Sequence, residues 1–90
     1  MKKGYVVYNE EFGVFIGMCF GLGFWSKLDP VDQPGAVAFS TIDDAVEFTK
    51  QVKSIFEFEI REVEDDQGGY ASIESCVRAG LPGWEIKSYA

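Results

Sequence analysis

Residues 5–17 read Tyr-Val-Val-Tyr-Asn-Glu-Glu-Phe-Gly-Val-Phe-Ile-Gly, and this stretch decides how the fold begins. Two runs rich in β-branched and aromatic residues, 5–8 and 14–20, are joined by a short segment ending in Gly13, which is typical of a β-hairpin. Because side chains alternate across a strand, we expect a bulky face of the second run in the core. Its small face leaves room for a helix, another backbone or a ligand, and its glycines predict a kink near Gly21. The bulky face carries Val14, Ile16, Met18, Phe20 and Leu22, and the small face carries Phe15, Gly17, Cys19, Gly21 and Gly23.

The middle of the chain predicts a loop, a strand and a helix, in that order. Residues 24–35 hold two prolines, a terminal glycine and no periodic pattern, so they predict a loop. Residues 36–39 predict a third strand, and Ser40 or Thr41 caps the helix that follows. Acids in the opening turns of that helix and lysines near its end complement the helix dipole. Its inward stripe, at three- and four-residue steps, is Ile42, Ala45, Val46, Thr49 and Val52, flanked by Phe48.

The last third of the chain predicts a strand and a second, shorter helix. Residues 56–61 alternate between apolar and charged side chains, as a strand does. At residues 62–63 the pattern reverses, which predicts either the end of the strand or a bulge. Residues 64–69 predict a charged turn, after which Ser72 caps a helix that stops at the Gly-Leu-Pro of residues 80–82.

Ninety residues with a mass of 10.0 kDa allow one small domain, 1–90, and 47% apolar residues are enough for its core. With a final strand at residues 84–88, the order is β-β-β-α-β-α-β. Consecutive strands joined by short connections usually pair. We therefore expect an α+β fold: one mainly antiparallel sheet of four to five strands with two helices, the first helix covering the face of Phe56, Phe58 and Ile60.

The residues that carry most enzyme chemistry are missing. Histidine is absent, so the usual general base and the usual partner of a Ser or Cys nucleophile are lacking. Cys19 and Cys76 have no basic residue placed to lower their pKa values, and two cysteines make neither a zinc site nor a disulfide framework. The Asp65–Asp66 turn lacks the spaced ligands of a calcium loop. The sequence predicts reduced structural thiols and a protein that is not an enzyme and has no metal or cofactor. No secretory signal opens the chain, which predicts the cytoplasm.

Charge is distributed unevenly along the chain. The formal net charge is −7, yet residues 29–66 alone carry −8, whereas residues 1–28 carry +1 and residues 67–90 are balanced. The acidic middle repels nucleic-acid phosphates and anionic lipid headgroups, so it either favours a basic protein partner or serves only solubility. For Trp25, a place over the domain's own core is the alternative to partner binding. The predicted partner-binding residues are Asp43, Asp44, Glu47, Glu57, Glu59, Glu64, Asp65, Asp66 and Trp25.

In segments 5–17, 24–27 and 38–45, an opening hairpin leads through a Trp-containing loop to a strand and a helix with Ala after two acids. This pattern, which spans about half of the chain, resembles short acidic orphan proteins of bacteriophages and mobile elements, among them anti-CRISPR proteins. The resemblance implies a phage-encoded inhibitor of a host defence that occupies a basic, nucleic-acid-binding host surface in the host cytoplasm. The β-β-β-α-β opening is also similar to HicB-type antitoxins, although this chain has a long proline-bearing loop and no recognisable DNA-binding tail.

Two further expectations concern other surfaces. The small face of Gly17, Cys19 and Gly21, beneath the Trp25 loop, is an alternative site for a flat small ligand of a regulatory domain. The first hairpin and its loop hold more aromatic residues than so small a domain easily buries. Because this end is also nearly neutral, we predict a homodimer through it. The aromatic residues concerned are Tyr5, Tyr8, Phe12, Phe15, Phe24 and Trp25.

Overall fold

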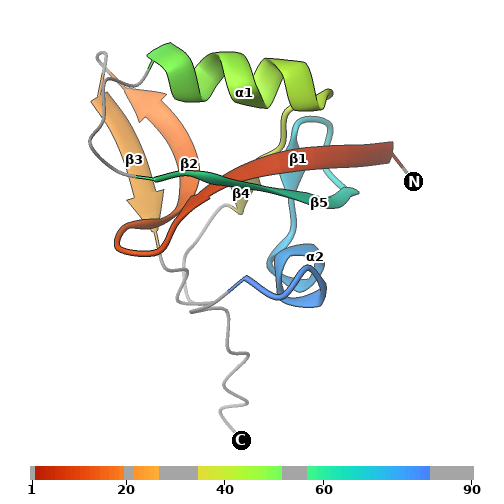
Figure 1. The fold of residues 1–90 in the computed structure, drawn as a ribbon. Coiled ribbons are helices and arrows are strands. Elements are labelled where there is room, and N and C mark those ends of the chain that lie inside the picture. The colour runs from red at the N-terminus through yellow and green to blue at the C-terminus, as the bar shows by residue number, and fades with distance from the viewer. Residues whose placement is uncertain (1, 20–21, 27–34, 52–56, 82–90) are drawn as a thin grey trace, which may run out of the picture.

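A computed structural model describes residues 2–19, 22–26, 35–51 and 57–81 of the chain. One antiparallel sheet lies between two helices, with α1 on one side and α2 on the other (Figure 1). This confirms the predicted α+β class. The elements are β1 (Lys2–Asn9), β2 (Gly13–Cys19), β3 (Leu22–Ser26), β4 (Ala36–Val37), α1 (Ile42–Gln51), β5 (Glu59–Asp65), β6 (Tyr70–Ala71) and α2 (Ile73–Arg78).

The strands follow the order β3-β2-β1-β5-β6-β4, and their pairing is antiparallel throughout. The longest pairing joins β1 to β5, from Lys2 opposite Asp65 to Tyr8 opposite Glu59. Its register is unbroken at Glu62 and Val63, so β5 neither ends nor bulges where the apolar pattern reverses. The predicted final strand at residues 84–88 lies outside the described residues.

The reversal of the pattern in β5 has a physical cause in the two helices. Ile60 packs with Ala45 of α1, whereas Val63 packs with Cys76 of α2. Residues three apart on a strand point to opposite faces. The strand is therefore covered by α1 near its start and by α2 near its end, and its apolar residues change face accordingly.

The predicted loop at residues 24–35 is wrong at its start. Residues 24–26 belong to β3, which pairs with β2 and places Trp25 opposite Phe15. A bulge between Phe15 and Gly17 shifts the register, and Gly17 takes a φ of 146°, which other residues rarely adopt. The kink predicted near Gly21 and the rest of the predicted loop, residues 27–34, lie outside the described residues.

The sheet has a different core on each side. Under α1 the core is aromatic: Phe15 lies 4.3 Å from Phe48 and 5.3 Å from Trp25 between ring centroids. Phe58 and Ile60 belong to this cluster, so the predicted covering of their face by α1 is confirmed, while Phe56 lies outside the described residues. The core on the side of α2 consists of small and β-branched side chains, namely Val6, Val14, Ala36, Ala38, Val63 and Ala71, with Tyr8, Cys76 and Leu81.

The segment after β4 returns to β1 and pairs with it in a single antiparallel bridge. The backbone N–H of Tyr5 donates to the Phe39 carbonyl at 2.9 Å, and the N–H of Phe39 donates to the Tyr5 carbonyl at 2.8 Å. A Cβ atom added to Gly4 would lie 2.7 Å from the Cβ of Ala38, closer than real side chains approach. Glycine at this position therefore allows the two segments to touch.

Both predicted helix starts are confirmed, with Thr41 as the cap of α1. The hydroxyl of Thr41 accepts from the N–H of Asp44 at 3.1 Å, and the hydroxyl of Ser72 accepts from the N–H of Ser75 at 3.1 Å. The predicted stop of α2 is also found. Gly80 has a φ of 76°, and Leu81 is buried behind it.

Candidate functional site: two acid-lined hollows

The predicted acidic surface is divided by the sheet. Asp43, Asp44 and Glu47 are exposed on α1. In a single acidic surface Glu57 and Glu59 would adjoin them, but Glu59 lies on the other side of the sheet, because α1 covers the strand face of Phe58 and Ile60, from which Glu59 points away. The neighbour and ion-pair partner of Glu59, Arg61, reaches the end of α2 instead, where its Nη1 donates to the Ala79 carbonyl at 2.9 Å.

Asp66 is exposed but has partners inside the chain. Its Oδ2 accepts from the Ser72 hydroxyl at 2.6 Å and from the Ser75 hydroxyl at 2.8 Å. These two hydrogen bonds hold the pKa of Asp66 below its usual range, since they favour the charged form. This carboxylate therefore stabilises the start of α2.

Glu64 and Asp65 also have partners within the fold. Glu64 Oε2 lies 2.8 Å from Arg78 Nη2, and both side chains are partly exposed. Both oxygens of Asp65 lie 2.9 Å from the backbone N–H of Gly69, which donates to them and closes the turn before β6. Of the predicted acidic residues, those of the 64–66 segment thus hold the turn and α2 together. Asp43 is exposed on α1 outside both hollows, and the other four line two separate hollows, Asp44 and Glu47 in one and Glu57 and Glu59 in the other.

Trp25 belongs to the aromatic core under α1. It is half-buried in β3, and its ring lies 5.4 Å from that of Phe58 and 6.5 Å from that of Phe48, between centroids. This is the alternative in which the tryptophan lies over the domain's own core. The structure does not place it beside the acids of α1 as part of one surface.

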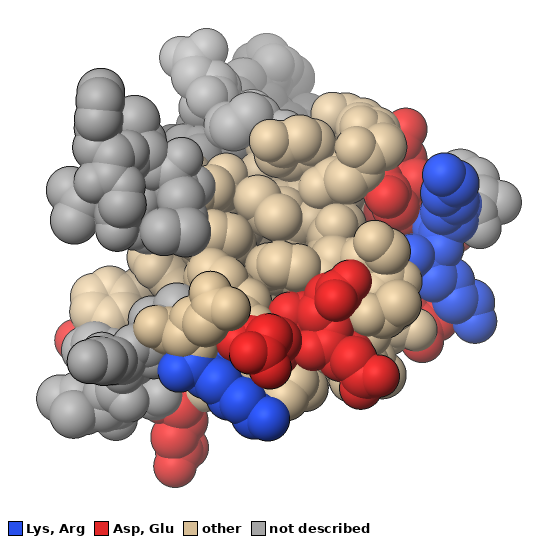
Figure 2. Space-filling view, turned by 90° about the horizontal axis from the view of Figure 1, so that it is seen from above, with Lys and Arg blue, Asp and Glu red and all other residues tan. Residues whose placement is uncertain are grey.

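The first hollow lies beside α1. It has a volume of about 390 Å³, with Phe39 and Phe48 as its aromatic lining and Asp44 and Glu47 on the helix side. Figure 2 views the molecule from the side of α1 and shows acidic side chains grouped on this face. Ala38, Ser40 and Gln51 complete the lining. The arrangement combines apolar area with negative charge, which suits a ligand that has an apolar part and a positive charge.

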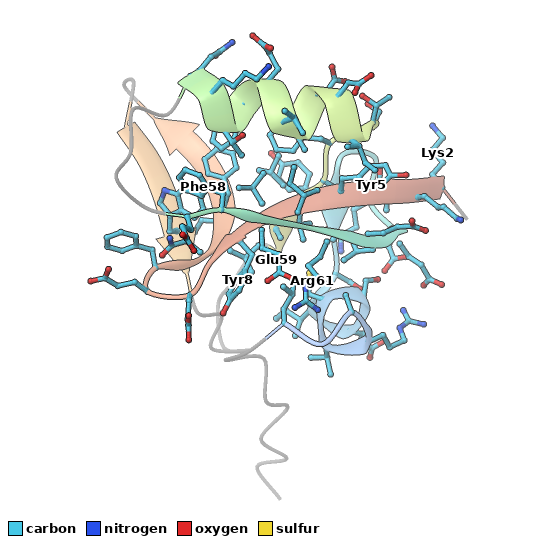
Figure 3. All side chains as sticks on the ribbon, in the orientation of Figure 1. Lys2, Tyr5, Tyr8, Phe58, Glu59 and Arg61 are labelled. Carbon is cyan, nitrogen blue, oxygen red and sulfur yellow. The ribbon has the colours of Figure 1, made fainter. Side chains whose placement is uncertain are left out.

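The second hollow is a groove on the side of α2, with a volume of about 350 Å³. Antiparallel pairing places Tyr8 directly opposite Glu59, and opposed residues share one face of the sheet. Figure 3 shows Tyr8, Glu59 and Arg61 together on the side of β1 and β5 where α2 lies. The lining residues are Tyr8, Glu10, Glu57, Phe58, Glu59, Arg61 and Gly80.

Buried Asn9 positions the acids of this groove. Its Nδ2 donates to the Glu57 carbonyl at 2.9 Å, which ties the segment just before β5 to the end of β1. Its Oδ1 accepts from the N–H groups of Glu11 and Phe12 at 2.8 and 3.0 Å. The side chain of Asn9 thereby shapes the turn that carries Glu10 and holds Glu57 beside it.

In this groove, the phenol of Tyr8 is surrounded by the carboxylates of Glu10, Glu57 and Glu59. Arg61 Nε lies 2.7 Å from Glu59 Oε1, so the one cation among the described residues that line the groove is already paired. Burial raises the pKa of Tyr8, and the charges of Glu10 and Glu59 raise it further. The phenol therefore stays protonated at neutral pH.

The described residues offer little for nucleophilic or metal chemistry. Cys76 is fully buried, and this burial raises the pKa of its thiol to about 12, as expected of a structural cysteine. Among the described residues, no group of three or more His, Cys, Asp or Glu side chains could hold a metal ion. None of the described helices is long and apolar enough to cross a membrane.

The aromatic residues predicted to form a dimer surface lie mostly inside the fold. Tyr8 and Phe15 are buried, Tyr5 and Trp25 are half-buried, and Phe12 is exposed. The side chain of Phe24 lies outside the described ones. The homodimer therefore stays a prediction, and the excess of aromatic residues that suggested it is largely taken up by the two cores.

The sequence did not single out Tyr8, Glu10 or Arg61 as site residues. For Arg61 the sequence signal is the alternation of residues 56–61, which points Glu57, Glu59 and Arg61 to one face, whereas Tyr8 and Glu10 are brought to this groove by the pairing of β1 with β5. Comparison with protein-family models, with curated proteins and with solved structures finds no match for this chain. The two hollows are therefore interpreted from their own geometry and charge.

Proposed function

We propose that this chain is a non-enzymatic protein-binding module that presents the hollow beside α1 to a basic partner. The observation that carries the proposal is the position of Asp44 and Glu47 along a hollow lined by the rings of Phe39 and Phe48. Carboxylates beside an aromatic surface suit the side chains of Arg and Lys, whose alkyl stems pack on apolar area while their charged ends pair with acids.

The charge of the chain supports the same proposal. A net charge of −7 attracts basic partners over distances comparable with the Debye length and repels nucleic acid. On α1, Asp43, Asp44 and Glu47 outnumber the described basic residue, Lys50. Charges at the rim of an interface mainly raise the association rate, so we expect binding that weakens as salt is added.

The resemblance drawn from the sequence makes the partner a nucleic-acid-binding host complex, and the module an inhibitor of the anti-CRISPR type. That identity stays a prediction. No described contact favours the HicB-like alternative. The small face proposed for a flat ligand is partly filled, since Phe15 is buried against Phe48, while Gly21 lies outside the described residues.

Selection of peptides from a random display library on the immobilised protein tests the proposal. We expect Arg- and Lys-rich peptides with aromatic or aliphatic residues, whose affinity falls about tenfold or more when Asp44→Lys and Glu47→Lys are combined. The matched control combines Glu11→Lys with Glu74→Lys, which changes the net charge equally at exposed acids outside both hollows. The proposal fails if no basic peptides are enriched, or if the control weakens their binding as much as the α1 variant does.

A further inference from the structure

The groove on the side of α2 contains the phenol of Tyr8, whose hydroxyl has no hydrogen-bond partner among the described residues. Tyr8 is only 6% exposed and lines the groove. None of the described residues forms a hydrogen bond with its hydroxyl. Its ring is buried, whereas its hydroxyl is open to the groove, where an occupant of the groove can pair with it. The phenol oxygen is thus an acceptor directed at whatever occupies the groove.

Two carboxylates beside this phenol are also without an ion-pair partner. Within the described part of the chain, Glu10 and Glu57 form no salt bridge, whereas Glu59 is taken by Arg61. The guanidinium of Arg61 is occupied twice, by Glu59 and by the Ala79 carbonyl. The groove therefore has acceptors to spare and few donors, which is the opposite of an anion site.

We infer that this groove binds an organic cation, the guanidinium or ammonium head of an alkyl chain. Glu10 and Glu57 accept its N–H groups together with the Tyr8 oxygen, and the ring of Tyr8 provides apolar lining for the alkyl chain. A volume of about 350 Å³ is sufficient for a side chain of the size of arginine. The groove is separate from the hollow beside α1, so the inference does not rest on the proposed function.

An organic cation fits the groove better than a metal ion does. Metal sites of hard cations need several carboxylate or carbonyl oxygens converging on one point. The acids of the groove form no such group among the described residues. The lining combines the phenol of Tyr8 with carboxylates, and this mixture favours a cation that has both N–H donors and an apolar stem.

Tyrosine labelled with ¹³C at Cζ reports directly on the groove. The chain has four tyrosines, so Tyr8→Phe assigns the Tyr8 resonance by its disappearance. N-butylguanidinium and butylammonium chloride are titrated at constant ionic strength, with potassium chloride and sodium butyrate as controls. We expect a saturable shift of the Tyr8 resonance with the two organic cations and none with the controls. An equal shift with potassium chloride, or no shift at all, overturns the inference.

Paired variants then test the residues. Combining Glu10→Gln with Glu57→Gln should weaken binding of butylguanidinium about tenfold, since two charge-assisted hydrogen bonds are lost. Glu11→Gln with Glu74→Gln, which removes the same charge outside the groove, should leave the affinity unchanged. Unaltered binding by the first pair overturns the inference. The substituted groove acids are exposed, and the amide spectrum of each variant checks that the fold is intact.

The source of the cation is decided in the same titration. A blocked pentapeptide with one central arginine among alanines is compared with butylguanidinium. Tighter binding of the peptide assigns the groove to an arginine side chain of a protein, and tighter binding of butylguanidinium assigns it to a free small amine or guanidine. Failure of both probes overturns the inference without affecting the proposal for α1, whose test uses Asp44→Lys and Glu47→Lys.

Discussion

The two sides of this sheet are packed by different kinds of side chain. Under α1, the rings of Phe15, Phe39, Phe48, Trp25 and Phe58 form one cluster. On the side of α2, alanines and valines allow backbone segments to touch, as where Ala38 lies against Gly4. The stability of the α1 side therefore depends on large side chains that fill its core. The α2 side depends on small side chains that let backbone segments approach each other.

The largest effect should come from the adjacent residues Val14 and Phe15, which face opposite sides of β2. Phe15→Ala should lower the free energy of unfolding by about 4 kcal/mol, because a ring 4.3 Å from that of Phe48 leaves a cavity. Val14→Ala, equally buried on the other side, should cost about 2 kcal/mol. Urea unfolding of both variants measures the difference. Equal losses would mean that the aromatic cluster is not the more demanding core.

Adding volume should harm the α2 side. Gly4→Ala should lower the free energy of unfolding by about 2 kcal/mol, since the new Cβ would lie 2.7 Å from that of Ala38. Combining it with Ala38→Gly removes the clash, so the double variant should lose less than the sum of the two single losses. Denaturant melts of the three variants provide the test. Strictly additive losses would show that the two segments do not touch.

The two helix caps, Thr41 of α1 and Ser72 of α2, should contribute less to the free energy of unfolding than the two cores do. Ser72→Ala should cost about 1.5 kcal/mol and Thr41→Ala about 0.7 kcal/mol, because the Ser72 hydroxyl both caps α2 and donates to Asp66. The pKa of Asp66 is lowered in the folded state, so its hydrogen bonds stabilise the fold above its unfolded pKa of about 3.9. They are lost as pH falls through the folded pKa, and the Ser72→Ala loss should shrink there. Thermal melts at neutral and acidic pH measure this; a pH-independent loss contradicts it.

The smallest effect at neutral pH should be that of Tyr8→Phe. The hydroxyl has no hydrogen-bond partner among the described residues, so we expect a change within about 0.5 kcal/mol. The pKa of Tyr8 is raised in the folded state by burial and by Glu10 and Glu59. Above about pH 10 the unfolded tyrosine loses its proton first, so the wild type should lose stability there.

The Tyr8→Phe variant lacks this proton, so it should lose less stability than the wild type over the same pH range. Urea unfolding of both proteins at neutral pH and above about pH 10 gives the comparison. If the free energy of unfolding depends on pH identically in the two proteins, the pKa of Tyr8 does not change on folding, and the prediction is wrong.

Local sequence patterns were enough to place much of this fold. Thr41 and Ser72 begin helices, and Gly80 ends one, because capping depends on a few neighbouring residues. The hairpin of β1 and β2 and the inward face of Phe58 and Ile60 follow from alternation along a single strand. Each of these features involves contacts within a few positions of the chain.

The two acidic hollows depended on contacts that no local pattern contains. Alternation shows that Glu57 and Glu59 share a face, but not that α1 covers the other face and so separates them from Asp44 and Glu47. Pairing of β1 with β5 brings Tyr8 opposite Glu59, two residues far apart in the sequence. A strand's pattern specifies its faces but leaves its partner and register open, and these are chosen by the packing of the whole domain.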